Sequence, residues 1–516
     1  MPQAIRNIVN KITRLEHARL SIKKDWLFLF LVLGGFILIT SFLAMHHEPW
    51  RDEAQDWLMA RDLGICSIFK MLSYSGHPML WYAILEFLDV LKLPYGSIFV
   101  VNLIIAWAGI FIFLVWSPFS KTIKVLLTFS TPFLIEYSTI ARGYALCLFL
   151  LFSVTALYDK REKYPIIYAL FISLIFNIHY LCLTAALFLT ILFIIDVRKR
   201  IEWKTFYISI AIMISGFVFS MLSLIPTADE GEASRFLRFE FGDIYEPATN
   251  AFSLDILWRA FPGLDVGYIR IIVGVISVLL LIILMLSFLD NKKATFFLYS
   301  SYSVMFGIFI FKLRGELRHH FFLIIFWIIA FWMYKNGKEI LLNMKDKCEK
   351  IRSLGMLVIV CSLLLSVSGA IALSIKEYKH QFSSAKDMAF FIRGNNLNKT
   401  HIIVSYPGWS GSALLPFLPE TKFWYPEKKG FGTFIIWDKE RERLEKELKN
   451  EDVLLRTINK QFSDKRNLLI LLNRPLEDPE RHNLKIMKEY SSENMIKLCE
   501  RFYLYYYKPG EKDFHL

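Results

Sequence analysis

Carboxylate and guanidinium side chains crowd the stretch WRDEAQDWLMARD (50–62), which starts just after the first long apolar block of the chain. A carboxylate at the boundary between lipid and water can act as a general base that takes the proton of an acceptor hydroxyl group. Asp52 is the candidate for this role, and Glu53 beside it is the candidate supporting group. Glu53 or Asp56 can also bind hydroxyl groups of a substrate, or an ion.

Polar residues gather in four further stretches at the ends of apolar blocks, namely GHP (76–78), EYSTIARGYAL (136–146), FNIHYL (176–181) and FKLRGELRHHFF (311–322). Arginine and lysine donors can hold a phosphate or diphosphate group and stabilise it as it leaves. The basic residues between 312 and 320 indicate an anionic partner. The candidate substrate-binding residues are His77, Arg142, Tyr144, His179, Arg314, Arg318 and His319.

The composition indicates an α-helical polytopic membrane protein. Hydrophobic residues make up 55% of the 516 residues and charged residues only 21%, which is less charge than a soluble protein of this size carries. The apolar blocks are long enough to cross a bilayer as helices. The candidate spans are 26–45, 98–116, 122–136, 143–158, 164–178, 180–196, 204–226, 269–289, 295–311, 319–334 and 352–375.

Loop charges give the predicted orientation, because short loops rich in Lys and Arg stay in the cytoplasm. If 77–91 also crossed the membrane, the basic loops at 121 and 159 would both fall on the outer side. This segment carries Glu86 and Asp89, which are costly inside a membrane, so we predict a helix lying along the outer interface. Eleven spans result, with a cytoplasmic N terminus and an outer C terminus. The candidate residues are then expected to meet on the outer side.

Three regions follow from this topology. Residues 1–25 are a basic cytoplasmic N terminus, 26–375 a transmembrane catalytic domain with outer loops 46–97 and 227–268, and 376–516 an extracytoplasmic α/β domain. In the third region, predicted strands are HIIVS (401–405), FIIW (434–437), NLLILL (467–472) and FYLYYY (502–507), and KERERLEKELKNEDVLL (439–455) is predicted to be helical. We expect the loop-rich stretch SYPGWSGSALLPFLPE (405–420) of this domain to cap the substrate cavity or to select the acceptor.

The candidates also have structural roles open to them. Asp52 and Gln55 have the spacing of a capping box, so Asp52 can cap a helix. His77 precedes a proline and can start a helix. His179 can be a packing histidine, and Arg142 can extend its charged end to the interface.

The motifs, taken in order, resemble the GT-C class of membrane glycosyltransferases. The resemblance is closest to the bacterial branch similar to protein O-mannosyltransferases and to the lipid A aminoarabinose transferase. It covers roughly 26–334 and rests on WRDEAQDWLMARD, GHPMLWYAIL, STPFLIEYSTIARGYALCLFLLF, FNIHYL and GELRHHFF. It implies that Asp52 is the catalytic carboxylate, with Glu53 beside it. It also implies that the cavity for donor and acceptor is lined by Arg142, His179, Arg318 and His319.

The resemblance further implies the reaction. A sugar would move, with inversion, from a polyprenyl-phosphate donor to a glycan, lipid or protein acceptor on the outer face of the bacterial cytoplasmic membrane. Several relatives carry a second acidic residue near the position of Arg142, whereas the nearest here is Glu136, so a role for Glu136 stays open. No cofactor is required, and no ligand spacing demands a divalent cation, although His46, His47 and His77 could approach the carboxylates and hold one. The favoured interpretation of His46 and His47 is a polar pair at the membrane interface.

Other classes of function remain as alternatives. A membrane transporter or lipid flippase would place ionisable groups near the midplane and often show paired repeats, whereas here the charges lie at one face. A non-catalytic receptor or assembly protein would make Asp52 replaceable. Transfer of phosphoethanolamine usually needs a metal-held nucleophile in a large soluble domain. No basic–aromatic module indicates nucleic acid, and six cysteines without paired spacing predict no disulfide framework.

Overall fold

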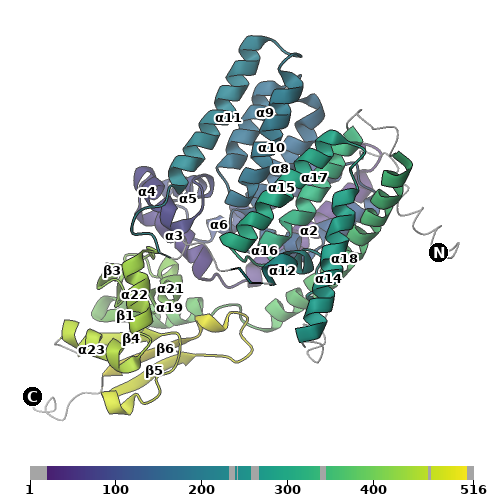
Figure 1. The fold of residues 1–516 in the computed structure, drawn as a ribbon. Helices are drawn as coiled ribbons and strands as arrows, with labels where there is room; N and C mark the ends of the chain where they lie inside the picture. Colours follow the sequence, from purple (N-terminus) through teal and green to yellow (C-terminus); the bar gives the residue numbers. More distant parts are fainter. Residues whose placement is uncertain are drawn as a thin grey trace, which may run out of the picture. The chain divides into compact units, whose positions relative to one another are not determined.

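The computed structural model describes residues 20–231, 239–240, 242–256, 267–336, 345–462 and 466–507. The chain divides into two compact units, and each unit combines stretches that lie far apart in the sequence (Figure 1). The first unit consists of 1–44, 101–222 and 236–374, and the second of 45–100, 223–235 and 375–516. Most of the basic N terminus predicted at 1–25 lies outside the described residues.

The first unit is helical. Its elements are α2 (Trp26–His46), α6 (Ser97–Trp116), α7 (Lys121–Thr128), the π-helix η1 (Pro132–Thr139), α8 (Tyr144–Leu157), the 3-10 helix η2 (Tyr158–Lys160), α9 (Pro165–Phe176), α10 (Tyr180–Val197), α11 (Trp203–Leu224), α12 (Gly242–Ala251), α14 (Gly267–Leu286), α15 (Lys292–Phe311), α16 (Leu317–His320), α17 (Phe322–Asn336) and α18 (Lys345–Lys379). Helices α2, α6, α11 and α18 continue beyond the unit at one end.

Eight helices among the described residues are long and apolar enough to cross a membrane, or nine if the bent pair of η1 and α8 counts as one span. These eight agree in position with eight predicted spans. The predicted count of eleven is not confirmed. The predicted span 122–136 is divided between α7 and η1, 143–158 is a helix bent by 116° against η1, and 164–178 forms only the 12-residue helix α9.

Helix α17 is the central element of the first unit. In the most apolar 18 residues of the span Leu317–Lys335, which covers nearly all of α17, 89% of the residues are buried, whereas the share is 28% in Trp203–Leu224 and in Gly267–Leu286. Helices α9, α10, α15 and α17 follow one another side by side in Figure 1, each in contact with the next. A helix that is apolar on all sides needs either lipid or protein around it, and α17 is surrounded by protein while the outer helices expose apolar residues.

The second unit is an α/β unit with a six-stranded sheet. Its helices are α3 (Arg51–Asp62), α4 (Ile65–Ser75), α5 (Leu80–Val90), α19 (Ala385–Gly394), α20 (Leu397–Thr400), α21 (Gly408–Gly411), α22 (Lys439–Glu447) and α23 (Glu451–Gln461), with 3-10 helices η6 (Ser412–Phe417), η7 (Glu480–His482) and η8 (Leu498–Glu500). Its strands are β1 (Ile402–Tyr406), β2 (Phe423–Tyr425), β3 (Gly430–Gly432), β4 (Leu468–Leu472), β5 (Leu484–Tyr490) and β6 (Phe502–Tyr507).

The sheet is mixed, with the strand order β3-β2-β1-β4-β6-β5. Strand β1 runs parallel to β2 and β4, while β6 pairs antiparallel with β4 and β5. All five residues of β4 are buried, because one apolar cluster covers each face of the sheet. Side chains alternate between the two faces of a strand, so Leu469 and Leu471 pack with α3, α19 and η6. Leu468 and Ile470 pack on the other face with α22 and α23.

Three predicted strands correspond to β1, β4 and β6, so the predicted fold class of a helical membrane protein with a C-terminal α/β region is confirmed. The prediction of a strand at 434–437 is wrong. There the backbone of Ile435 bonds to a side chain of α3 instead of a neighbouring strand. The predicted helix 439–455 is two helices, because the Asn450 side chain caps α23. The predicted domain boundary at 376 stays a prediction.

Helix α5 lies within the segment predicted to lie along the membrane interface, 77–91. Its eleven residues are too few to cross a bilayer, which agrees with the prediction that this segment does not span. Its position at the interface, and the orientation of both termini, stay predictions. Much of the predicted outer loop 227–268 lies outside the described residues.

Candidate functional site

Asp52 lies in the first turn of α3, the helix that the acidic stretch forms. The prediction that Asp52 caps this helix is wrong. The helix begins at Arg51, its N-cap residue is Trp50, and the N–H of Trp50 donates to Glu53 Oε2 over 3.1 Å. Glu53 therefore does the capping, three residues after the N-cap, where an acidic side chain can reach back to the first N–H groups. The Asp52 side chain is left 22% exposed, which keeps it accessible to a substrate.

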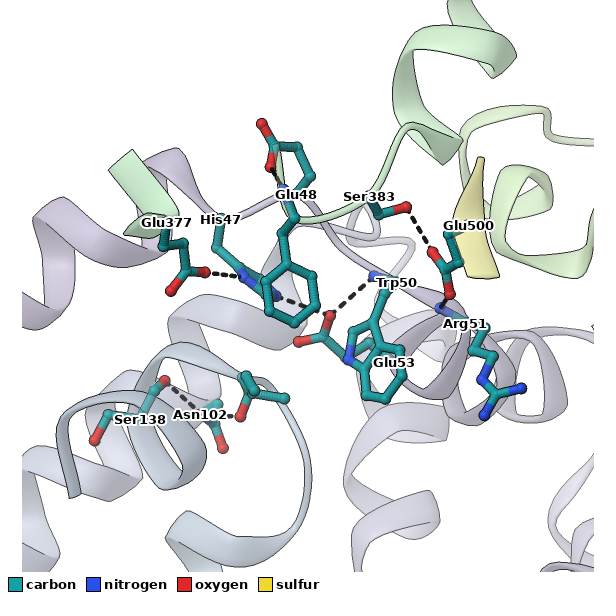
Figure 2. Close-up of polar contacts among 12 residues, drawn as sticks. His47, Glu48, Trp50, Arg51, Glu53, Asn102, Ser138, Glu377, Ser383 and Glu500 are labelled. Carbon is teal, nitrogen blue, oxygen red and sulfur yellow. Dashed lines mark hydrogen bonds and ion pairs between the residues drawn. The ribbon is translucent and has the colours of Figure 1, made fainter. Parts of the chain in front are cut away.

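Glu53 is held in a buried chain of three side chains with His47 and Glu377 (Figure 2). Its Oε2 atom lies 3.1 Å from His47 Nε2, and His47 Nδ1 lies 2.5 Å from Glu377 Oε1. The imidazole thus bridges the start of α3 to the C-terminal end of α18. Glu53 was predicted as a catalytic residue, and in this position it can orient α3 and Asp52 without reaching a substrate.

The two carboxylates favour the imidazolium form of His47. Burial by itself lowers the pKa of His47, but the charges and hydrogen bonds of Glu53 and Glu377 outweigh this effect and raise the pKa to about 10. A charged imidazole donates from both ring nitrogens, which suits an acceptor on each side. His47 is therefore expected to carry its charge at neutral pH. The sequence interpretation as an interfacial polar pair with His46 misses this bridging role.

Glu500 supplies a second carboxylate to the start of α3. Its Oε1 atom accepts from the N–H of Arg51 over 2.8 Å, and its Oε2 atom accepts from Ser383 Oγ over 2.5 Å (Figure 2). Burial raises the pKa of Glu500 to about 7, against the opposing effect of these hydrogen bonds. A carboxylate at a helix N terminus is stabilised by the helix dipole. Neither Glu377 nor Glu500 follows from the sequence, because each lies more than 300 residues from its partner.

Gln55, in the second turn of α3, ties this helix to the backbone that follows β3. Its amide donates to the carbonyl of Ile435 over 2.8 Å and accepts from the N–H of Ile435 over 2.9 Å. Further along, Asp56 Oδ1 accepts from the Tyr82 hydroxyl over 2.9 Å. Asp56 is thus a packing residue of α3 and α5. His77 is half-buried in the turn between α4 and α5, in the same unit as Asp52.

The first unit brings three of the predicted binding residues together as a ring cluster of Tyr144, His179 and His319. The ring centroids of Tyr144 and His179 are 5.1 Å apart, and those of Tyr144 and His319 are 5.8 Å apart. The N–H of Glu316 donates to His319 Nδ1 over 2.9 Å, so a neutral His319 carries its proton on Nε2. That nitrogen lies 2.8 Å from the Tyr144 hydroxyl. The hydroxyl and imidazole therefore form a directed polar pair.

Arg318 lies beside the ring cluster. Its Nη1 atom is 2.9 Å from Glu316 Oε2 and 3.7 Å from Glu136 Oε2, and its backbone carbonyl accepts from the Tyr137 hydroxyl over 2.7 Å. Arg142 is close enough to act electrostatically on Arg318. Glu136 is thus a partner of Arg318, and this is the contact through which it can take part in a site.

The turn that carries Arg142 is shaped by a bond from another helix. Asn102 of α6 donates from Nδ2 to the carbonyl of Ser138 over 2.8 Å (Figure 2) and to that of Ile140 over 3.3 Å. A π-helix leaves carbonyl groups at its end without a helical partner. The Asn102 amide meets this need, so the chain can turn at 140–143 and begin α8 at Tyr144.

Arg314 has protein carboxylates as partners. It forms an ion pair with Glu240, and its Nε atom is 3.3 Å from Asp243 Oδ1. His320 is likewise engaged, because its Nε2 donates to the Arg314 carbonyl over 2.6 Å and its Nδ1 lies 3.0 Å from the Asn250 amide. Gly315 between them has φ +80°, and a Cβ atom at this position would lie only 2.8 Å from His320 Nε2. Glu240 and Asp243 therefore neutralise part of the positive charge on which the prediction of an anionic partner rests.

The predicted residues thus form two groups. Asp52, Glu53 and His77 belong to the second unit, while Arg142, Tyr144, His179, Arg314, Arg318 and His319 belong to the first. Their meeting in one site stays a prediction. No group of three or more histidine, cysteine, aspartate or glutamate side chains in the described ranges is arranged to hold a metal ion.

A comparison with solved structures decides the fold. The lipid A aminoarabinose transferase ArnT from Cupriavidus metallidurans, solved in complex with undecaprenyl phosphate, matches 95% of this chain and 100% of its own length. The TM-score is 0.53 and the sequence identity 10%. The chain has the GT-C membrane glycosyltransferase fold. No family model matches the sequence, and no curated protein is similar to it in sequence.

The GT-C fold accounts for both units, because the match to ArnT extends beyond 26–334, where the sequence motifs lie, to nearly the whole chain. The structural class inferred from the motifs is therefore confirmed, and the chain is a multi-pass membrane protein. An identity of 10% leaves the individual side chains to be judged by their own geometry.

Proposed function

We propose that this GT-C protein is an inverting glycosyltransferase that moves a sugar from a polyprenyl-phosphate donor to a glycan, lipid or protein acceptor. The observation that carries the proposal is the likeness of nearly the whole chain to ArnT, a protein solved with undecaprenyl phosphate. The apolar helices support a location in the bacterial cytoplasmic membrane. The predicted orientation would put the second unit on the outer side, where a lipid-linked sugar is available after translocation.

The donor phosphate is assigned to the ring cluster and its cations. Arg318 and Arg142 supply positive charge, and His319 and Tyr144 supply hydrogen-bond groups in a buried setting. Charge-assisted hydrogen bonds of this kind are stronger away from water. Glu316 and Glu136 now pair with Arg318, so a phosphate would take the place of one carboxylate partner. Arg314 contributes less positive charge to the donor phosphate, because it already pairs with Glu240 and Asp243.

Asp52 is assigned the role of general base. Its carboxylate accepts the proton of the acceptor hydroxyl while the acceptor oxygen forms a bond to C1 of the sugar. The bond between C1 and the phosphate oxygen breaks on the opposite face, and its electron pair leaves with polyprenyl phosphate. The configuration at C1 is inverted. A bound divalent cation could neutralise phosphate charge, but the proposal assigns it no step.

Loss of the gene should leave the envelope without one sugar and leave the donor unused. Mass spectrometry of glycans and of lipid-linked sugars, in the deletion strain and in the complemented strain, measures both pools. We expect one glycan species to be lighter by one sugar residue and the corresponding polyprenyl-phosphate sugar to accumulate. If the lipid-linked sugar is depleted or both pools are unchanged, the proposed function is wrong, and depletion would indicate a role in synthesis of the donor. Loss of a flippase would also make the lipid-linked sugar accumulate, so transfer by the purified protein separates a transferase from a flippase.

Replacing Tyr144 with phenylalanine should lower kcat/KM for the lipid-linked donor about tenfold, the scale of one hydrogen bond to a charged group. The hydroxyl bonded to His319 is lost, while the ring packing stays. Transfer rates of the purified variant in nanodiscs give the measurement. Tyr302→Phe is the matched control, because the buried Tyr302 hydroxyl donates to the Leu323 carbonyl of α17. Equal losses of activity in both variants would contradict a role for Tyr144 in binding.

A further inference from the structure

The second unit contains a cavity of about 270 Å³ between the end of β2 and the start of α22. Its walls combine apolar and charged side chains from three segments. The residues on which the inference rests are Glu427, Phe434, Asp438 and Arg441. None of them belongs to the groups assigned above to donor or base.

Glu427 is a buried carboxyl group at this cavity, with 1% of its surface exposed. Its Oε1 atom accepts from the N–H of Gly408 over 2.5 Å. Its Oε2 atom has no hydrogen-bond partner in the described part of the chain. Burial raises the pKa of Glu427 to about 7, so near neutral pH the group can either donate or accept. A buried polar atom without a partner is costly, and an ordered water or a ligand hydroxyl group would remove this cost.

Arg441 also lines the cavity and contains a second buried polar atom. Its guanidinium group lies 4.3 Å from the ring centre of Trp437, and Nη1 is 2.5 Å from Glu445 Oε2. The side chain is 8% exposed, and its Nε–H lacks an acceptor among the residues the structure describes. Two residues of the cavity lining thus hold a polar atom left unmatched by the described residues, a donor in Arg441 and a carboxyl oxygen in Glu427.

We propose that this cavity binds one saccharide unit. Sugar hydroxyls donate and accept at once, so they can satisfy both Glu427 Oε2 and Arg441 Nε. Phe434 and the neighbouring Ile435, Ile436 and Leu444 give an apolar wall for the C–H groups of a sugar ring. Four acidic and three basic residues line the cavity, namely Asp229, Glu427, Asp438, Glu440, Lys428, Lys429 and Arg441. This balance disfavours a phosphate ligand.

The assignment of this saccharide to the acceptor rests on the proposed function, whereas its binding can be measured without any transfer. A subsite away from the reacting sugar would hold the glycan chain and so select acceptors that carry the right unit. The α/β region would then take part in selecting the acceptor, through residues other than the stretch 405–420 for which the sequence predicts this role.

Saturation-transfer NMR on the full chain in nanodiscs tests the site, with methyl glycosides of glucose, galactose, mannose and N-acetylglucosamine as probes. We expect ring-proton signals from at least one glycoside with the wild type. Glu427→Gln and Arg441→Lys should each weaken that binding at least tenfold, the effect of leaving one buried polar group unmatched. Glu447→Gln is the matched control, because Glu447 lies on α22 at the surface and pairs with Arg443.

Folding of each variant is checked by its melting curve, and Glu427→Gln should keep the fold because an amide closely replaces a protonated carboxyl group. The proposal is overturned if no glycoside gives a signal, if both variants bind like wild type, or if inorganic phosphate displaces the glycoside. If glycoside binding depends on Glu427 but deletion of the gene changes no glycan, the saccharide site stands and the proposed transferase activity is wrong. Transfer without glycoside binding would refute the site alone.

Discussion

Replacing Asp52 with asparagine should reduce sugar transfer by roughly 10²- to 10⁴-fold, the contribution of a general base. The amide has nearly the same shape as the carboxylate but cannot take the proton of the acceptor hydroxyl. Helix α3 should keep its start, because Glu53 and Glu500 cap the N–H groups of Trp50 and Arg51. The effect should therefore fall on kcat, with little change in the melting temperature.

The measurement compares wild type and Asp52→Asn in single-turnover transfer from a polyprenyl-phosphate sugar, after both have passed size exclusion in detergent. Asp62→Asn is the matched control on the same helix, because its carboxylate bonds to Arg61 and Thr433. It should retain activity near that of wild type. If folded Asp52→Asn transfers sugar at the wild-type rate, the base lies elsewhere and the assignment of Asp52 is wrong.

Replacing His47 with glutamine should destabilise the protein by about 3–5 kcal/mol, the cost of removing one partner from a buried ion pair. Glu53 and Glu377 would lose the cation that lies between them, and Glu48 nearby is also acidic and partly buried. The start of α3 would shift or loosen as a result, so transfer should fall as well. Chemical unfolding in detergent measures the loss of stability.

His46→Gln is the control, since the same substitution one residue earlier falls on an exposed side chain that packs against Tyr378. It should change stability by less than about 0.5 kcal/mol, as surface substitutions usually do. The double variant His47→Gln with Glu377→Gln should be less unstable than the sum of the single changes, because one unmatched carboxylate is gone. Strict additivity would mean that His47 and Glu377 do not stabilise each other.

The same bridge makes stability depend on pH. The pKa of His47 is raised from 6.5 to about 10, so folding favours its protonated form. The stabilisation is fully present below pH 6.5 and is lost as the pH rises toward 10. The stability difference between wild type and His47→Gln should therefore shrink between these values. A difference that stays constant up to pH 10 would contradict a charged His47.

Much of the membrane part follows from local sequence. Apolar length alone predicts eight spans where the structure has them, since a helix satisfies its own backbone and needs only an apolar surface toward lipid. The short motif FNIHYL places His179 at a helix start, and GELRHHFF places His319 beside it in the fold. Their meeting with Tyr144 was foreseen because turns on one side of a membrane lie at the same depth.

Other features were decided by tertiary structure. The apolar run 122–136 does not predict the break in the helix at η1. This break depends on the side-chain amide of Asn102 in α6. The partners of Glu53 could not be predicted, because His47 and Glu377 come together only when α18 returns to α3. The cap from Glu500 joins residues 449 positions apart. Charge and hydrophobicity along the chain therefore determine which segments enter the membrane and which polar residues are candidates for a site. Pairing between distant buried side chains determines which carboxylate stays exposed, because each buried charge must find its partner in space.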